Sequence, residues 1–305
     1  MKKYLSFFLK LAVSGTLLFY LFRQTDFKLL LHTFKQVSSG WLIASIFVFF
    51  IFQLVSAFRW YEILKVLGFK RDLSFICRVY FIGMFFNAFL PGILGGDLIR
   101  VFYVVKEGSS KTLASFSVAY DRAFGFLGAL FLLIIFVPLE GDFMPSHTRH
   151  SIFYFSVTVL TITFGMAIFS RFWHERLGKN LAHTMTLVFK IRNFLKLFSL
   201  GLAVQVLYNI HVSLLGKSLG ISIPWLKYFL IIPLMGILAS LPISLGGFGV
   251  REGTLAYFLN LLGEPKEMGI ALGFLTYGVA LLGGLVGGYF YLRGDSKRQK
   301  QSDKY

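Results

Sequence analysis

Two short stretches of the sequence share one arrangement of proline, paired glycine and arginine. Residues 90–100 and 241–251 both fit Leu-Pro-x-x-Leu-Gly-Gly-x-x-x-Arg, with an offset of 151 residues. Proline ends an incoming helix because it lacks an N–H and clashes with the preceding turn. A glycine pair then lets the chain reverse where side chains would collide. The repetition at one spacing indicates an internal repeat with a break in each copy.

The segment after each glycine pair has the chemistry of an anion-binding site. A helix that starts there presents free backbone N–H groups and the positive end of its dipole. Arg100 and Arg251 lie one turn further on, and their planar guanidinium groups suit a phosphate. A structural alternative stays open, in which Asp97 caps the helix and Arg251 pairs with Glu252 or Asp97.

Further polar residues within or beside apolar stretches complete the candidates, because charges at membrane depth are costly and usually functional. Asp121 and Arg122 either serve the site or form a mutual ion pair. Asn87 is either a ligand contact or a hydrogen-bonding group between helices. The candidate substrate-binding residues are Asn87, Pro91, Gly95, Gly96, Asp97, Arg100, Asp121, Arg122, Pro242, Ser244, Gly246, Gly247, Arg251 and Glu252.

Metal and nucleophile chemistry finds little support in the sequence. Cys77 is the single cysteine, so a disulfide framework and a thiolate metal site are both excluded. The six histidines have no metal-ligand spacing with carboxylates, and no phosphate-binding loop of the P-loop type occurs. We therefore expect no metal and no cofactor.

The elements that carry the candidate residues are those of a membrane protein. Hydrophobic residues make up 56% of the 305 residues and charged residues only 15%, against about 25% charged in soluble domains. The net charge of +17 comes from Lys and Arg in short runs between apolar segments. This distribution is typical of cytoplasmic loops beside anionic lipid, and it argues against a nucleic-acid partner.

Six apolar stretches are long enough to span a bilayer, for which about 18 or more residues are needed. They are residues 5–22, 41–58, 112–139, 151–170, 194–215 and 269–292. Lys10 interrupts the first stretch, which we interpret as a membrane helix and not as a cleaved signal. Two more apolar stretches, 73–106 and 227–262, contain the proline-glycine breaks.

The basic residues of the loops distinguish two topologies, once six Lys and Arg placed within the membrane are left out. If both broken stretches span, the loops hold 14 basic residues inside and 11 outside; if both are re-entrant, the split is 18 to 7. The second topology makes 59–71, 106–111 and 171–192 cytoplasmic. We therefore predict an all-α polytopic membrane protein with six full spans and two inverted re-entrant helical hairpins, about eight hydrophobic segments. Paired broken helices in two halves of a chain indicate a transporter's binding site.

One transmembrane domain over 1–295 and a basic cytoplasmic tail over 296–305 follow from this topology. We expect both termini in the cytoplasm and the protein in the plasma (bacterial inner) membrane. Apolar residues at helical spacing over 173–188 predict an amphipathic helix, either at the cytoplasmic interface or packed on the core. Gly283, Gly284, Gly287 and Gly288 predict close packing of the last span on a neighbouring helix.

The motifs together resemble one family. Asn87-x-x-Leu-Pro-Gly-x-x-Gly-Gly-Asp-x-x-Arg100, then Asp121-Arg122, then Leu-Pro-Ile-Ser-x-Gly-Gly-x-Gly-x-Arg-Glu-Gly over 241–253 are similar to the lysylphosphatidylglycerol synthase transmembrane-region family. The resemblance covers nearly the whole chain. It implies an anionic, aminoacylated or otherwise modified membrane lipid as substrate and its movement between leaflets as activity. Synthases of this type also carry a soluble acyltransferase-like domain, and its absence here leads us to expect no transferase activity.

Three functions stay in competition at this point. The first is a flippase-like translocator of a phospholipid or lipid-linked substrate. The second is an integral-membrane transferase in lipid or glycolipid modification, with Asp97 or Glu252 as base. The third is a non-catalytic partner that binds lipid for a separate lipid-modifying enzyme. The pair of inverted breaks favours the first.

Overall fold

The computed structural model describes residues 2–23, 25–89, 95–169, 179–241, 243–244 and 246–302. The secondary structure of these ranges is helical, with no strand among them. The helices are α1 (Lys2–Arg23), α2 (Phe27–Lys35), α3 (Ser39–Val66), α4 (Leu73–Phe89), α5 (Gly95–Lys106), α6 (Lys111–Glu140), η1 (Gly141–Phe143), α7 (Ser146–Phe169), α8 (Lys179–Val188), α9 (Ile191–Ser218), α10 (Trp225–Ser240), α11 (Val250–Leu261) and α12 (Lys266–Ser302).

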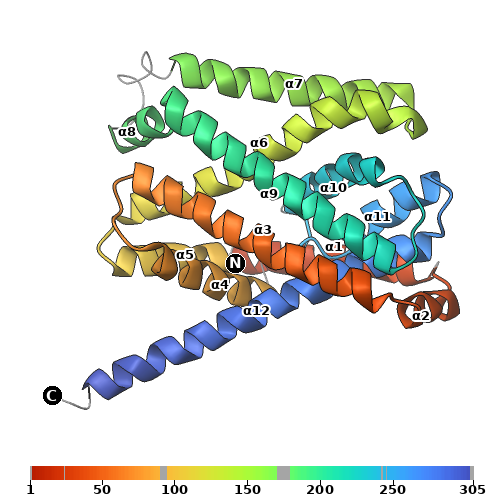
Figure 1. Ribbon diagram of the computed structural model, residues 1–305, viewed down its shortest axis with the longest axis horizontal. Coiled ribbons are helices and arrows are strands. Elements are labelled where there is room, and N and C mark those ends of the chain that lie inside the picture. Colours follow the sequence, from red (N-terminus) through yellow and green to blue (C-terminus); the bar gives the residue numbers. More distant parts are fainter. Residues whose placement is uncertain are drawn as a thin grey trace.

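Four helices of the described ranges are long and apolar enough to cross a membrane. They cover Ser39–Val66, Lys111–Phe143, Ile191–Ser218 and Lys266–Arg293, and each contains one of the predicted spans. Shorter apolar helices occur at Ala12–Arg23, Leu73–Ala88 and Trp225–Ser240. The long helices run from one end of the molecule to the other, with α7 along one edge and α12 along the opposite edge (Figure 1). The predicted all-helical, multi-pass membrane class is thus confirmed.

Both broken stretches form pairs of helices that pack on each other, α4 with α5 and α10 with α11. Helices α5 and α11 each have 12 residues, which is about 18 Å of helix, short of an apolar bilayer core of about 30 Å. The loops on either side of the α4–α5 pair lie at one end of the molecule, and those on either side of α10–α11 lie at the other end (Figure 1). The inverted, re-entrant topology itself stays a prediction.

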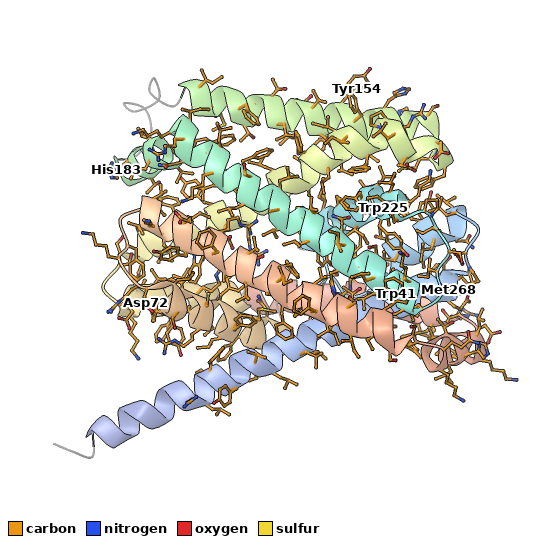
Figure 2. The ribbon with its side chains drawn as sticks, viewed as in Figure 1. Trp41, Asp72, Tyr154, His183, Trp225 and Met268 are labelled. Carbon is orange, nitrogen blue, oxygen red and sulfur yellow. The ribbon has the colours of Figure 1, made fainter. Side chains whose placement is uncertain are left out.

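Side chains mark the same two ends. Asp72, which precedes α4, and His183 of α8 lie at one end of the molecule, whereas Trp41 and Met268 lie toward the other (Figure 2). The first end also holds the start of α9, and the second holds α2 and the loop before α12. The charge distribution predicts that the first end is cytoplasmic.

Close contacts between glycines and neighbouring backbones hold the long helices together. A Cβ on Gly287 of α12 would lie 1.9 Å from the carbonyl oxygen of Phe81 in α4. A Cβ on Gly201 of α9 would lie 2.3 Å from the carbonyl oxygen of Phe124 in α6. Any larger residue at either position would force the helices apart, so the close packing predicted for the glycines of the last span is confirmed.

A small apolar cluster fixes the first hairpin to its neighbours. Trp60 of α3, Ile76 and Val79 of α4, Val104 of α5 and Val118 of α6 are buried together. The hairpin is thereby a packed part of the helical bundle and not a surface loop.

Two boundaries differ from the sequence prediction. Arg59, predicted to open a cytoplasmic loop, lies within α3 with 5% of its surface exposed, because that helix continues to Val66. Helix α12 continues to Ser302, past the predicted end of the last span and into the predicted basic tail. Helix α8 starts at Lys179, and the first half of the predicted amphipathic helix lies outside the described residues. Val188 at its end is fully buried in the main core, as expected for a core-packed helix.

The two hairpins generate a topology prediction that uses paired cysteines in a Cys77→Ala background. Lys70→Cys and Ser109→Cys, on either side of the first hairpin, should both react with a membrane-impermeant maleimide only from the cytoplasmic side. Ser222→Cys and Asn260→Cys, on either side of the second, should both react only from outside. All four positions are at least partly exposed. If the two members of a pair label from opposite sides, that hairpin spans the membrane.

Candidate functional site

An ion-pair network lies where the first hairpin meets α3 and α6. Asp121 of α6 accepts from Arg59 Nε of α3 through Oδ1 and from Arg100 Nη2 of α5 through Oδ2, both at 2.8 Å. These three residues are at most 6% exposed. Burial of so many charges is tolerated only when each is paired, because the desolvation cost of an unpaired ion is several kcal/mol.

Asp97 extends this network toward the end of the hairpin. Its Oδ1 lies 3.6 Å from Arg100 Nη1, and its Oδ2 accepts from Nε of Arg122. Asp121 and Arg122, adjacent in sequence, therefore pair with different partners and not with each other. Among the described residues, three arginines and two aspartates thus form one connected network.

The guanidinium group of Arg100 is enclosed by aromatic rings. It lies 4.1 Å from the ring centroid of Trp60 and 4.7 Å from that of Tyr80, a cation–π geometry. Trp60 is held in place by a hydrogen bond of 3.1 Å from its Nε1 to Ser117 Oγ. Only 7% of the Arg100 side chain is exposed. Arg100 was predicted to contact a phosphate. This geometry favours a structural ion pair for Arg100 instead.

The start of α5 depends on glycine and on Asn87. The amide oxygen of Asn87 accepts from the Gly96 N–H at 2.7 Å, so it satisfies one of the free donors at this helix N-terminus. A Cβ on Gly96 would lie 2.1 Å from the carbonyl oxygen of Gly83. Gly95 is the first residue of α5, which starts at the glycine pair itself. Pro91 lies outside the described residues.

The second hairpin turns through glycines in the left-handed region. Gly246, Gly247 and Gly249 have φ values of +60°, +81° and +81°, which other residues adopt only at a cost. Glu252 is fully buried; its Oε2 accepts from the Gly249 N–H at 2.8 Å. Ser244 is 1% exposed, and its hydroxyl finds no hydrogen-bond partner in the described part of the chain. Pro242 lies outside the described residues.

Arg251 and Tyr277 connect the second hairpin to the first. Arg251 pairs with Oε1 of the adjacent Glu252 at 3.1 Å, the pairing that the sequence left open. Its guanidinium carbon lies 5.4 Å from the ring centroid of Tyr277 in α12. The hydroxyl of Tyr277 donates to the carbonyl oxygen of Ala88, near the end of α4, at 3.1 Å. One aromatic residue thus touches both hairpins.

A cavity of about 310 Å³ lies between the two hairpins. Among its lining residues are Asn87, Arg122, Tyr208, Ser240, Gly246 and Arg251. Two guanidinium groups from opposite halves of the chain therefore border one space. The side chain of Arg122 is 44% exposed and that of Arg251 is 13% exposed.

Of the predicted site residues, Asn87, Arg122, Gly246 and Arg251 border the cavity. Asp97 and Glu252 are buried and pair with Arg122 and Arg251. Arg100 and Asp121 are buried and pair with each other, and neither lines the cavity.

Sequence reasoning missed three contributors to this site. Arg59 carried a signal, since it directly follows an apolar run, yet the same position also suits the first residue of a basic loop. Tyr208 of α9 and Tyr277 of α12 carried none, because tyrosines are frequent in this chain. Only the packing of distant helices brings Tyr208 to the cavity and Tyr277 to Arg251.

The network generates a stability prediction. Asp121→Ala should lower the free energy of unfolding by about 3–5 kcal/mol, because it leaves two buried arginines without their carboxylate. Arg71→Ala is the matched control, since it breaks the exposed ion pair between Arg71 and Glu107 and should cost about 0–1 kcal/mol. Thermal unfolding in detergent measures both. Equal melting temperatures for the two variants would show that the network does not hold the hairpin.

Comparison with known proteins identifies the family of the chain. No match to the chain was found among curated proteins. The model of the family described as Lysylphosphatidylglycerol synthase TM region matches residues 7–288, which include both hairpins and the cavity between them. The chain therefore belongs to the Lysylphosphatidylglycerol synthase TM region family, whose members are membrane proteins tied to lipid modification.

Proposed function

We propose that this protein translocates an anionic lipid between the leaflets of the membrane, with the lipid's phosphate bound between Arg122 and Arg251. The observation that carries the proposal is the cavity bordered by one arginine from each half of the chain. Guanidinium groups suit phosphate because their planar donors match its oxygens in pairs. The family's tie to lipid modification supports a lipid as the bound molecule.

The charged groups at the cavity suit a phosphodiester. Arg122 and Arg251 border the cavity, and Asp97 and Glu252 each hold one of these guanidinium groups. A headgroup that crosses an apolar bilayer unaided would lose its hydration without replacement, at a cost of several kcal/mol. The two arginines would offset that cost at the middle of the path.

Movement between leaflets requires that the site open to each side in turn. Two inverted hairpins around one cavity are the arrangement with which transporters achieve this, by rocking one repeat against the other. The family of the chain and the short return helices α5 and α11 are consistent with such a mechanism.

The transferase alternative needs a carboxylate that can reach its substrate as a base. Asp97 is 6% exposed and bonded to two arginines, and Glu252 is fully buried and bonded to Arg251 and Gly249. Both carboxylates are occupied in holding the arginines. These contacts favour translocation over group transfer.

The arginine prediction uses proteoliposomes with a leaflet-resolved assay of fluorescent phosphatidylglycerol. Arg122→Ala and Arg251→Ala should each lower the translocation rate about tenfold or more, since each removes a charged hydrogen bond worth about 1.5–3 kcal/mol. Lysine at either position should restore the rate only in part, because it lacks the planar fork. Lys70→Ala, which removes an exposed cation outside the cavity, should leave the rate unchanged. Wild-type rates in both arginine variants would refute the proposed site.

Translocation also predicts an unchanged substrate. Phosphatidylglycerol and its lysylated form should each appear in the opposite leaflet with the same mass as before incubation. Mass spectrometry of the extracted lipids provides the measurement. A covalently altered lipid, formed by the wild type and missing with Asp97→Asn or Glu252→Gln, would instead establish a transferase.

A further inference from the structure

A second and larger cavity, of about 550 Å³, lies between α6, α9 and α10. The smaller cavity between the two hairpins is called the headgroup cavity below. The two cavities share four lining residues: Arg122, Tyr208, Gly236 and Ser240. The two spaces therefore adjoin, and Arg122 stands at the junction. The larger space is called the α6–α10 groove below.

The groove is apolar beyond this junction, and small residues make it wide. Ala119, Ala123 and Phe126 follow one face of α6 at helical spacing, and Ala129 continues the same face. From Ala119 to Ala129 the helix rises about 15 Å. Small side chains here leave room for an elongated apolar molecule alongside the helix.

The remaining polar group of the groove is engaged with the protein. The side-chain amide of Gln205 in α9 donates to the carbonyl oxygen of Gly125 at 2.9 Å. On the facing side, Gly236 of α10 has no atom within 4 Å of the position that a Cβ would occupy. The wall opposite α6 is thus open at this point.

We infer that the α6–α10 groove holds one acyl chain of the lipid whose phosphate lies between Arg122 and Arg251. This inference rests on the proposed function. A lipid has a charged end joined to an apolar chain, and the two adjoining cavities have the same order of chemistry. A chain kept in an apolar groove allows the headgroup to reach the middle of the protein without exposing hydrocarbon to the polar cavity.

Which hydrocarbon chains occupy this groove should depend on how they pack against its walls and on whether their headgroup is bound. A hydrocarbon chain is already in an apolar medium in the bilayer, so entry gives little hydrophobic gain. Occupancy should therefore depend on the headgroup anchor. A chain that belongs to a lipid without a bound headgroup should enter the groove no more often than it touches any other lipid-facing surface.

The test uses phosphatidylcholine vesicles that contain phosphatidylglycerol with a photoreactive diazirine in one acyl chain. After irradiation, mass spectrometry should find adducts on the groove walls, at residues 119–129 and 233–237. At Gly236 an added Cβ meets no atom within 4 Å, so Gly236→Leu extends a side chain into open space and should lower these adducts several-fold. Gly278→Leu is the matched control, because it also has no atom within 4 Å but lies on α12, away from the groove. Ala123→Leu, which lines the larger cavity and not the smaller one, should act like Gly236→Leu.

The headgroup dependence separates this inference from the proposed function. Phosphatidylcholine carrying the same diazirine chain should give few groove adducts, and Arg251→Ala should reduce those of phosphatidylglycerol. Equal groove labelling by both headgroups would mean ordinary surrounding lipid and would overturn the inference. If the groove walls are not labelled but translocation still requires both arginines, the acyl-chain inference is wrong and the proposed headgroup site stands. Groove labelling that is unchanged when both arginines are replaced would show that the headgroup does not anchor the chain and would overturn the inference as well.

Discussion

The two hydrogen bonds that Asp121 accepts from Arg59 and Arg100 are the interaction on which the rest of the site depends. They join three helices, α3, α5 and α6, through charges that are almost completely buried. In an apolar medium such charges are stable only as a set, because the loss of one member strands the others. The position of the return helix α5, and with it the location of Asp97 beside Arg122, follows from this constraint.

Backbone contacts at glycine complement the ion pairs. Lipid surrounds the outside of the bundle, so burial of apolar surface distinguishes poorly between one helix pairing and another. Close approach at Gly201 and Gly287 supplies specific packing instead. The same property allows the turns of both hairpins, where Gly96 accepts no side chain and Gly249 has a left-handed backbone. Glycine therefore sets both the bundle and the edges of the cavity.

The division between buried and accessible charges explains how the site could act on a lipid. Arg100 holds the scaffold, whereas Arg122 and Arg251 border the headgroup cavity. Each of these two arginines already has a carboxylate partner, Asp97 or Glu252. The carboxylates hold the guanidinium groups in place, and in the proposed mechanism a phosphate binds between them. The adjoining α6–α10 groove would accommodate the apolar part of the same molecule.

The sequence alone determined the membrane class, the two broken stretches and the set of charges near them, because hydrophobic length, proline and glycine act locally along the chain. The doubled motif also directed attention to the two hairpins that border the cavity. Which charge pairs with which was decided only in the tertiary structure. Asp121 binds Arg59, 62 positions away, in preference to the adjacent Arg122. Tyr277 reaches the site through the packing of α12 on α4. Such partners depend on distances between helices remote in sequence, which no local pattern encodes.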